Sequence, residues 1–178
     1  MKRAMRRLIC TATALLAFGF ISVAQTYSEV EVTDEENNTL IQEITPQVFA
    51  ALGIDNSTNP ENANLQGNSV FIRQVGEFNR TDIKIASNAS NINLGQNGDD
   101  NLISLEYTVN TAIATLRQNG NGHIIRDFVL DQNADVSLDL EQTGNGFYFE
   151  RYGSNSITES LKFKQTEASP VIIIRSFN

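Results

Sequence analysis

The sequence has almost none of the residues that build metal centres, disulfides and nucleophilic active sites. Its 178 residues include one cysteine, one histidine and no tryptophan. Cys10 lies in an apolar stretch near the N-terminus, and His123 is the lone histidine. A zinc site or a Ser/His/Asp triad therefore has very little to draw on. We expect no metal, no cofactor and no enzymatic activity.

Long apolar runs are also missing, except at the N-terminus. Four basic residues at positions 2, 3, 6 and 7 precede the run LICTATALLAFGFI, and small residues follow it up to Ala24. This order is typical of a secretory signal peptide, and the run is shorter than the roughly 20 apolar residues of a membrane anchor. We predict a signal peptide at 1–24. Its cleavage would remove Cys10 and leave an exported chain without a thiol.

Basic residues are scarce in the remainder of the chain. Of 13 Lys and Arg, four lie in the signal peptide, so nine remain against 21 Asp and Glu, a net charge of −12. A chain this acidic is a poor ligand for nucleic acid or anionic lipid. Residues 25–67 hold eight of the acids and no Lys or Arg, which predicts an acidic leader distinct from residues 68–178.

The leader is rich in Asn, Glu and Thr and ends in DNSTNPENANLQGN, which predicts a flexible, largely disordered segment or linker. Inside it, LIQEITPQVFAALGI has enough apolar residues for a short amphipathic helix that Pro46 would begin or interrupt. Two interpretations stay open: the leader keeps the chain soluble, or a secretion channel or partner recognises it as a targeting signal.

One phrase recurs from Asn68 onward: Gln, any residue, Gly. Its glutamines are spaced by 22, 22, 24 and 23 residues, and the fifth copy lacks the Gly; they are Gln74, Gln96, Gln118, Gln142 and Gln165. Repeats of this length fill the chain to its end, with predicted boundaries 68–89, 90–111, 112–135, 136–158 and 159–178.

Apolar residues alternate with polar ones on both sides of each turn. In the second repeat they are Ile92 and Leu94 before the Gly, and Ile103 and Leu105 after it. A period of two predicts two strands per repeat, each with one buried face. Such a unit cannot bury its apolar face alone, so the repeats must stack. The predicted fold is an all-β, two-sheet β-solenoid of five strand-turn-strand rungs.

Stacking places equivalent positions of successive repeats next to one another. When the glutamines set the register, four outward columns bring opposite charges together in neighbouring rungs and no like charges, as cross-strand energetics favour. The predicted pairs are Lys84 with Glu106, Arg126 with Glu150, Asp139 with Lys162, and Glu141 with Arg117 and Lys164.

The recurring phrase predicts a tight turn at the end of each first strand. Glycine supplies the backbone freedom of the turn, and inward-facing glutamine amides can hydrogen-bond from rung to rung. The predicted ladder and turn residues are Gln74, Gly76, Asn79, Gln96, Gly98, Asn101, Gln118, Gly120, Gln142, Gly144 and Gln165.

These residues resemble the curlin repeat, the unit of bacterial curli fibre subunits. Its pattern is Ser, five residues, Gln, x, Gly, two residues, Asn, x, Ala, three residues, Gln. The second repeat matches best, with Ser90, Gln96, Gly98 and Asn101 at family positions. The later repeats depart from the pattern at the Asn position, which holds His123, Phe147 and Pro170.

The resemblance implies a secreted subunit of a Gram-negative bacterium. It would pass an outer-membrane curli-type pore with accessory proteins, and then assemble with itself or other curlin subunits into amyloid fibres of an adhesive biofilm matrix at the cell surface. Degenerate ladders and an unusual last repeat favour the minor, nucleating type of subunit. The alternative is a monomeric secreted solenoid that binds a surface glycan or protein through Phe71, Phe128, Tyr148 and Tyr152.

An open solenoid leaves unpaired backbone groups at both ends, where another chain can pair. The last rung, SPVIIIRSF, is β-prone and nearly uncharged, so Val171, Ile172, Ile173 and Ile174 are the candidate polymerisation edge. The competing interpretation places Ile172 and Ile174 in the core, with Val171 and Ile173 as a cap.

A few residues invite sharper functional interpretations. Asp127 and Arg151 fall in an inward column that is otherwise Ile or Leu, which predicts either a buried ion pair or a register slip in the third repeat. His123 is interpreted as a turn residue that still hydrogen-bonds. Asp99 and Asp100 are weak calcium candidates. Turns this short do not predict a substrate cleft like that of polysaccharide-cleaving β-helices.

Overall fold

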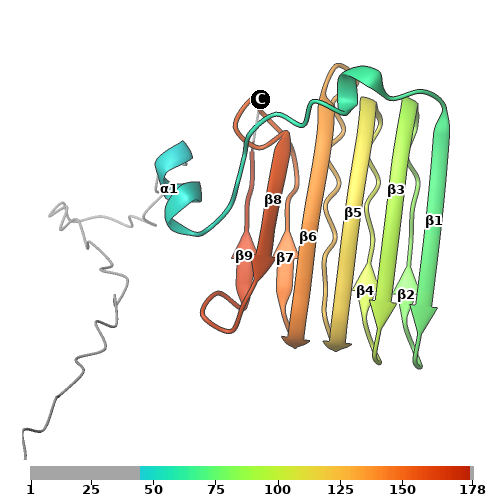
Figure 1. Cartoon of the computed structure of the whole chain (residues 1–178), viewed down its shortest axis with the longest axis vertical. Helices are drawn as coiled ribbons and strands as arrows, with labels where there is room; N and C mark the ends of the chain where they lie inside the picture. The colour runs from blue at the N-terminus through green and yellow to red at the C-terminus, as the bar shows by residue number, and fades with distance from the viewer. Residues whose placement is uncertain (1–44, 177–178) are drawn as a thin grey trace, which may run out of the picture. The chain divides into compact units, whose positions relative to one another are not determined.

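The computed structural model describes residues 45–176, and most of them wind into a parallel β-solenoid (Figure 1). The main sheet has the order β1-β3-β5-β6-β8, with one strand from each repeat and every neighbouring pair parallel. The predicted all-β solenoid of two sheets is therefore confirmed. The predicted signal peptide and residues 25–44 of the predicted leader lie outside the described residues.

Each rung crosses the main sheet with a long strand and returns through a much shorter one. The main-sheet strands are β1 (Asn68–Val75), β3 (Ser87–Asn97), β5 (Val109–Asn121), β6 (Asp135–Asn145) and β8 (Ser160–Gln165). The returning strands are β2 (Arg80–Thr81), β4 (Leu102–Ile103), β7 (Tyr148–Glu150) and β9 (Val171–Ile173), with a bridge at Ile124 between β4 and β7.

The returning strands are shorter than the alternation predicts. Beyond Ile103 and Ile125 the backbone changes to positive φ, from Leu105 to Thr108 and from Arg126 to Leu130. Hydrogen bonds between rungs nevertheless continue there, as from the Leu105 N–H to the Arg126 carbonyl oxygen at 2.6 Å. Inward and outward positions therefore still alternate where the regular strand has ended.

The register of the main sheet is the one that the glutamines predict. Gln74, Gln96, Gln118, Gln142 and Gln165 are Cα partners from strand to strand. The two extra residues of the third repeat do not shift it, because they are absorbed in a turn where the Ala134 N–H donates to the Asp131 carbonyl oxygen at 3.0 Å. The register slip considered for this repeat is thus wrong.

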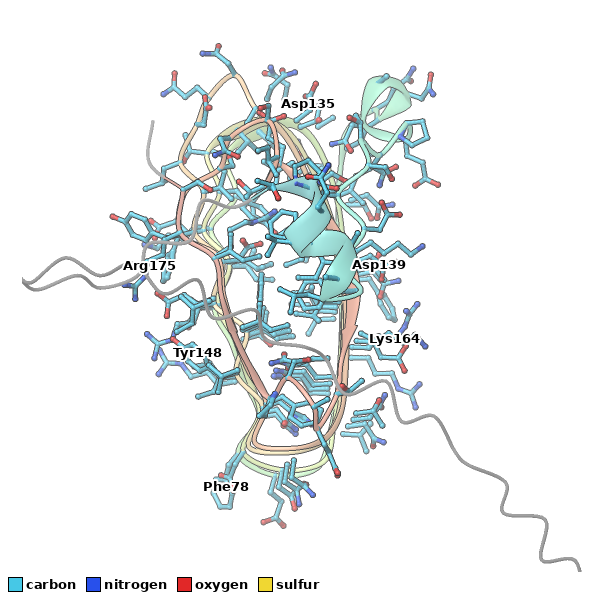
Figure 2. All side chains as sticks on the ribbon, turned by 90° about the vertical axis from the view of Figure 1, so that its left-hand side faces the viewer. Phe78, Asp135, Asp139, Tyr148, Lys164 and Arg175 are labelled. Atoms are coloured by element: carbon cyan, nitrogen blue, oxygen red, sulfur yellow. The ribbon has the colours of Figure 1, made fainter. Side chains whose placement is uncertain are left out.

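The core consists of columns of apolar side chains between the two sheets. Figure 2 looks along the stack, where side chains of one column overlap and charged residues such as Lys164 lie outside. One column of the main sheet is Leu94, Leu116, Leu140 and Phe163, each at most 5% exposed. Burying a side chain of this size stabilises the fold by about 1.5–3 kcal/mol.

Residues 45–67, predicted as part of a flexible leader, instead pack on the solenoid. Helix α1 (Pro46–Ala51) has Pro46 at its first position and Thr45 as its N-cap. Beyond α1 the chain runs across the rung ends to a 3-10 turn, η1 (Asn62–Asn64), and then enters β1 (Figure 1). The Asn62 side chain is buried and donates to Thr111 Oγ1 at 2.9 Å. Buried anchors such as this one hold a segment that its composition marks as a linker.

The glycines at the turns form a column in which the backbones of successive rungs come very close together. A Cβ on Gly98, whose φ is +118°, would lie 2.2 Å from the Gly120 carbonyl oxygen, whereas one on Gly122, at φ +67°, meets nothing within 4 Å. We expect Gly122→Ala to cost about 1–2 kcal/mol for its left-handed backbone alone. Gly98→Ala should cost about 3 kcal/mol or more, because backbone must also move. Urea unfolding of both variants measures this difference, and equal costs would contradict it.

Candidate functional site

A continuous ladder of glutamine amides runs through the solenoid at the end of the main-sheet strands. In each step the Nε2 of one glutamine donates to the Oε1 of the next. The four distances from Gln74 through Gln96, Gln118 and Gln142 to Gln165 are 2.6, 2.9, 2.9 and 2.9 Å. Gln96, Gln118, Gln142 and Gln165 are at most 2% exposed. The ladder therefore satisfies amides that would be costly to bury unpaired.

The same amides also join the two sheets. Gln96 Nε2 donates to the Arg80 carbonyl oxygen at 3.2 Å, and Gln118 Nε2 donates to that of Leu102 at 3.1 Å. Each of these amides thus uses one hydrogen for the glutamine of the next rung and one for the returning strand of the preceding repeat. A single residue type fixes the stacking register and joins the main sheet to the returning strands.

The ladder has a direction, so its two ends differ. Gln74, in the first rung, donates to Gln96 and to Thr81 Oγ1, but its Oε1 accepts no hydrogen bond from any described residue. Gln165, in the last rung, donates to the carbonyl oxygens of Tyr148 and Pro170, both at 2.7 Å. At the first rung the Oε1 of Gln74 is thus free to accept a hydrogen bond. At the last rung both amide hydrogens of Gln165 are already donated to carbonyl oxygens of the same chain.

A second ladder runs through the corner after each turn. Asn79 Oδ1 accepts from the Asn101 N–H at 3.2 Å, and Asn101 Oδ1 accepts from the His123 N–H at 3.0 Å. His123 replaces the next asparagine: its Nδ1 accepts from the Phe147 N–H at 3.2 Å, and its Nε2 lies 3.3 Å from the Asn119 carbonyl oxygen. His123 is thus a fully buried turn residue that continues the hydrogen-bonded column.

A third set of turn contacts escaped the sequence analysis. Asp99 Oδ1 accepts from the Glu77 N–H and Asn121 Oδ1 from the Asp99 N–H, both at 2.8 Å, and Asn145 Oδ1 accepts from the Asn121 N–H at 3.0 Å. The signal was present, because an Asp or Asn stands three residues after Gln96, Gln118 and Gln142. Asp99, a weak calcium candidate, therefore orders a neighbouring turn.

The first rung presents an open sheet edge. All eight residues of β1 are exposed, including Val70 at 53% and Ile72 at 44%, which occupy the inward columns that are buried in later rungs. On the outer face Phe71 is 60% exposed. The β1 strand pairs only with β3, so the backbone groups on its other side are unpaired. We call β1 and β2 together the N-terminal edge.

The last rung contains the candidate polymerisation edge, Val171 to Ile174, which stays a prediction. Ile172 and Ile174 are buried core residues, whereas Val171 and Ile173 are 59% and 49% exposed. In β8 the inward residues Leu161, Phe163 and Gln165 are all buried. This distribution matches the competing interpretation for Ile172 and Ile174.

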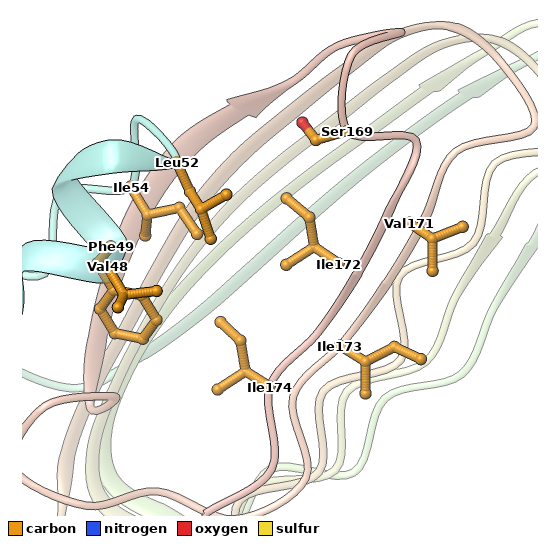
Figure 3. Close-up of a pocket in the computed structure, with 9 residues that line it drawn as sticks. All are labelled: Val48, Phe49, Leu52, Ile54, Ser169, Val171, Ile172, Ile173 and Ile174. Carbon is orange, nitrogen blue, oxygen red and sulfur yellow. The ribbon is translucent and has the colours of Figure 1, made fainter. Parts of the chain in front are cut away.

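The N-terminal segment covers this last rung. Figure 3 shows Val48, Phe49, Leu52 and Ile54 facing Ile172 and Ile174 across an apolar cleft of about 270 Å³. Phe49 and Ile54 are 2% and 3% exposed and belong to the core. Asp55 pairs with Lys162 of β8 through two backbone hydrogen bonds of 2.9 and 2.7 Å. We call residues 46–55 the cap.

Ion pairs line the outer faces between rungs. Three predicted pairs form: Lys84 with Glu106 at 2.9 Å, Lys162 with Asp139 at 3.5 Å and Lys164 with Glu141 at 2.8 Å. The hydrogen bond from Lys164 lowers the pKa of Glu141. The predicted pairs of Arg126 with Glu150 and of Arg117 with Glu141 do not form between these described residues. Glu150 instead accepts from Tyr148 and pairs with Arg175 at 3.4 Å.

Asp127 and Arg151 form a fully buried ion pair between the third and fourth rungs. Arg151 Nε lies 2.5 Å from Asp127 Oδ1, and its Nη2 lies 2.9 Å from Oδ2. Tyr107 donates to Asp127 Oδ2 at 2.6 Å, and Arg151 Nη1 donates to the Thr158 carbonyl oxygen at 2.9 Å. Burial and the neighbouring carboxylate raise the pKa of Tyr107, which stays a neutral donor. These bonds compensate the desolvation of both charges.

Comparison with known proteins does not assign this chain to a family: no family model, curated protein or solved structure matches it. Within residues 45–176, no group of three or more His, Cys, Asp or Glu side chains could hold a metal ion. The same part of the chain contains no helix long and apolar enough to cross a membrane. The distinctive features are thus the ladders, the open N-terminal edge and the cap.

The buried ion pair makes a prediction about stability. Asp127→Asn keeps the side-chain size but leaves the Arg151 guanidinium charge buried without its counter-ion, which should cost about 3–5 kcal/mol. Asp82→Asn is the control, since Asp82 pairs with Arg80 at 2.9 Å on the exposed surface and should contribute under about 1 kcal/mol. Urea unfolding measures both, and similar losses would contradict the role of burial.

The cap makes a prediction about local opening. Phe49→Asp would place a carboxylate in an apolar contact, so the cap should detach while the solenoid stays folded. Because the Lys162 N–H donates to the Asp55 carbonyl oxygen at 2.7 Å, its hydrogen exchange should accelerate by about tenfold or more. Ala50→Asp, on the exposed side of the same helix, should leave it unchanged. Unchanged protection in Phe49→Asp would show that the cap is held by other contacts.

Proposed function

We propose that this protein is a structural subunit of extracellular, curli-like amyloid fibres that stacks rung on rung at its N-terminal edge. Its export would use the predicted signal peptide, an outer-membrane curli-type pore and accessory proteins. Its partners at the cell surface would be itself or other curlin-like subunits, in fibres that support adhesion and biofilm matrix.

The open N-terminal edge is the observation that carries this proposal. Val70 and Ile72 lie in columns whose members in the next rung, Ile92 and Leu94, are 0% and 1% exposed. Adding one more rung would bury them in the same way and would pair the free backbone groups of β1. Each added rung would present an equivalent edge, so stacking can propagate.

The unequal ends favour a minor, nucleating subunit over the bulk fibre subunit. A subunit that is added repeatedly needs two accessible ends, one for the preceding copy and one for the next. Here the cap occupies the last rung through Phe49, Ile54 and the backbone pair of Asp55 with Lys162. A chain with one ready edge fits the start of a fibre better than its interior.

A monomeric surface-binding solenoid is the second candidate. Phe128 and Tyr152 lie on the outer side of neighbouring rungs with ring centroids 6.3 Å apart, and Tyr152 is 53% exposed. Paired outward aromatics suit a glycan or protein ligand. A binder of this kind would stay monomeric at high concentration, whereas a fibre subunit would not.

Fibre growth from purified residues 25–178 tests the proposal. Thioflavin T fluorescence should rise after a lag, and electron micrographs should show fibres. Ile72→Lys should lengthen the lag by about tenfold or more, because stacking would bury an unpaired ammonium. Leu130→Lys replaces another exposed apolar residue, 60% against 44% for Ile72, away from the N-terminal edge and should behave as the unchanged chain. A persistently monomeric wild type would overturn self-assembly, and equal growth of Ile72→Lys would overturn stacking at this edge.

A further inference from the structure

We propose that the N-terminal edge selects its partner by charge: it accepts a rung of a different β-solenoid subunit that carries a carboxylate immediately before its ladder glutamine. It disfavours the last rung of a second copy of this chain. The inference rests on the proposed function, since it identifies the partner of the same edge.

Arg73 is the residue that creates this preference. Its column continues through Gly95, Arg117, Glu141 and Lys164. Arg117 neighbours Glu141, and Glu141 accepts a hydrogen bond from Lys164 within a 2.8 Å ion pair. Arg73 faces only Gly95 and has no hydrogen bond or ion pair with any described residue. A carboxylate in an added rung would give Arg73 the neighbour that the other basic residues of this column have.

The last rung of a second copy would bring the wrong charge. Stacked on β1 in the same register, it would place Lys164 next to Arg73. In the returning part of the rung, Arg175 stands ten residues after Gln165, as Lys84 stands ten residues after Gln74, so the same stacking would also bring Arg175 next to Lys84. Two like-charge contacts would thus form, and like charges directly opposite each other destabilise a sheet.

The amide ladder and the cap also disfavour the docking of a second copy. The free Oε1 of Gln74 requires a glutamine that can donate from the added rung. Gln165 already uses both amide hydrogens on the carbonyl oxygens of Tyr148 and Pro170. Lys162 in the same strand has its N–H and carbonyl oxygen bound to Asp55. A second copy would therefore have to break existing bonds in order to dock.

The sequence order that fits the edge is apolar, acid, glutamine. The fourth rung of this chain contains it as Leu140, Glu141 and Gln142. Placed on β1 in register, a strand of this sequence would set its glutamate beside Arg73 and its glutamine amide above Gln74. It provides a defined probe of the edge.

Peptide binding with a charge reversal tests the preference. The probes are labelled peptides of residues 136–145, VSLDLEQTGN, and the same peptide with Glu141→Lys, measured by fluorescence anisotropy against residues 25–178. The unchanged protein should bind the acidic peptide about three- to tenfold more tightly, with a smaller difference in 0.5 M salt. Arg73→Glu should invert the order, and Arg73→Gln should abolish the difference. Equal binding, or no binding of either peptide, would overturn the proposal.

Self-assembly gives an independent readout. Because Arg73→Glu would face Lys164 of a second copy, it should shorten the lag of thioflavin T growth relative to the wild type, and Arg73→Gln should lie between them. Arg73 faces only Gly95 within the chain, so the melting temperature of the monomer should change little. If wild type assembles as fast as Arg73→Glu, a second copy is the natural occupant and the charge preference is wrong. In that case stacking at the edge stands, whereas equal growth of Ile72→Lys would remove both proposals.

Discussion

Everything in this solenoid depends on keeping buried glutamine amides hydrogen-bonded. An amide without partners in a dry interior costs more than most single contacts contribute. Here each interior glutamine finds one acceptor in the next rung and one in the returning strand of the preceding repeat. Only one stacking register satisfies all of them, so the ladder sets the columns in which apolar and charged residues meet.

The direction of that ladder makes the two ends chemically different. Since each glutamine Nε2 donates to the Oε1 of the following rung, the Oε1 of Gln74 in the first rung is left without a donor among the described residues. The last rung has no free amide hydrogen to match it, because Gln165 donates to the carbonyl oxygens of Tyr148 and Pro170. Polarity of this kind is built into any parallel stack of amides. The cap strengthens it, since it covers only one end, as sheet proteins commonly protect an edge.

Local regularity explains what could be predicted from the sequence. The period of two, the recurring Gln-x-Gly phrase and the opposite charges at Lys84 and Glu106 all depend on neighbouring repeats, and they indicated the solenoid and its register. The predicted returning strands were too long. Alternation of apolar and polar residues indicates which side chains are buried, but it does not indicate the positive φ of residues such as Leu105 and Arg126.

The cap and the buried ion pair required three-dimensional information. Phe49 and Ile54 lie in a segment whose polar composition resembles a linker, and they contact residues more than 100 positions away. The sequence showed that Asp127 and Arg151 share a column, but it could not distinguish a pair from a slip. That choice depends on whether the two extra residues of the third repeat enter the strand or the turn at Asp131, and turn geometry decided it.

A sheet edge alone has little power to choose its partner, since any extended chain can supply backbone hydrogen bonds. Side chains must therefore provide the selectivity. Inside the solenoid the Asp127–Arg151 pair does so for the third and fourth rungs, because either charge would be buried alone if the rungs were paired differently. At the N-terminal edge Arg73 can act in the same way at the surface. An unpaired charge favours one class of rung and penalises another, and specificity of this kind rests on repulsion as much as attraction.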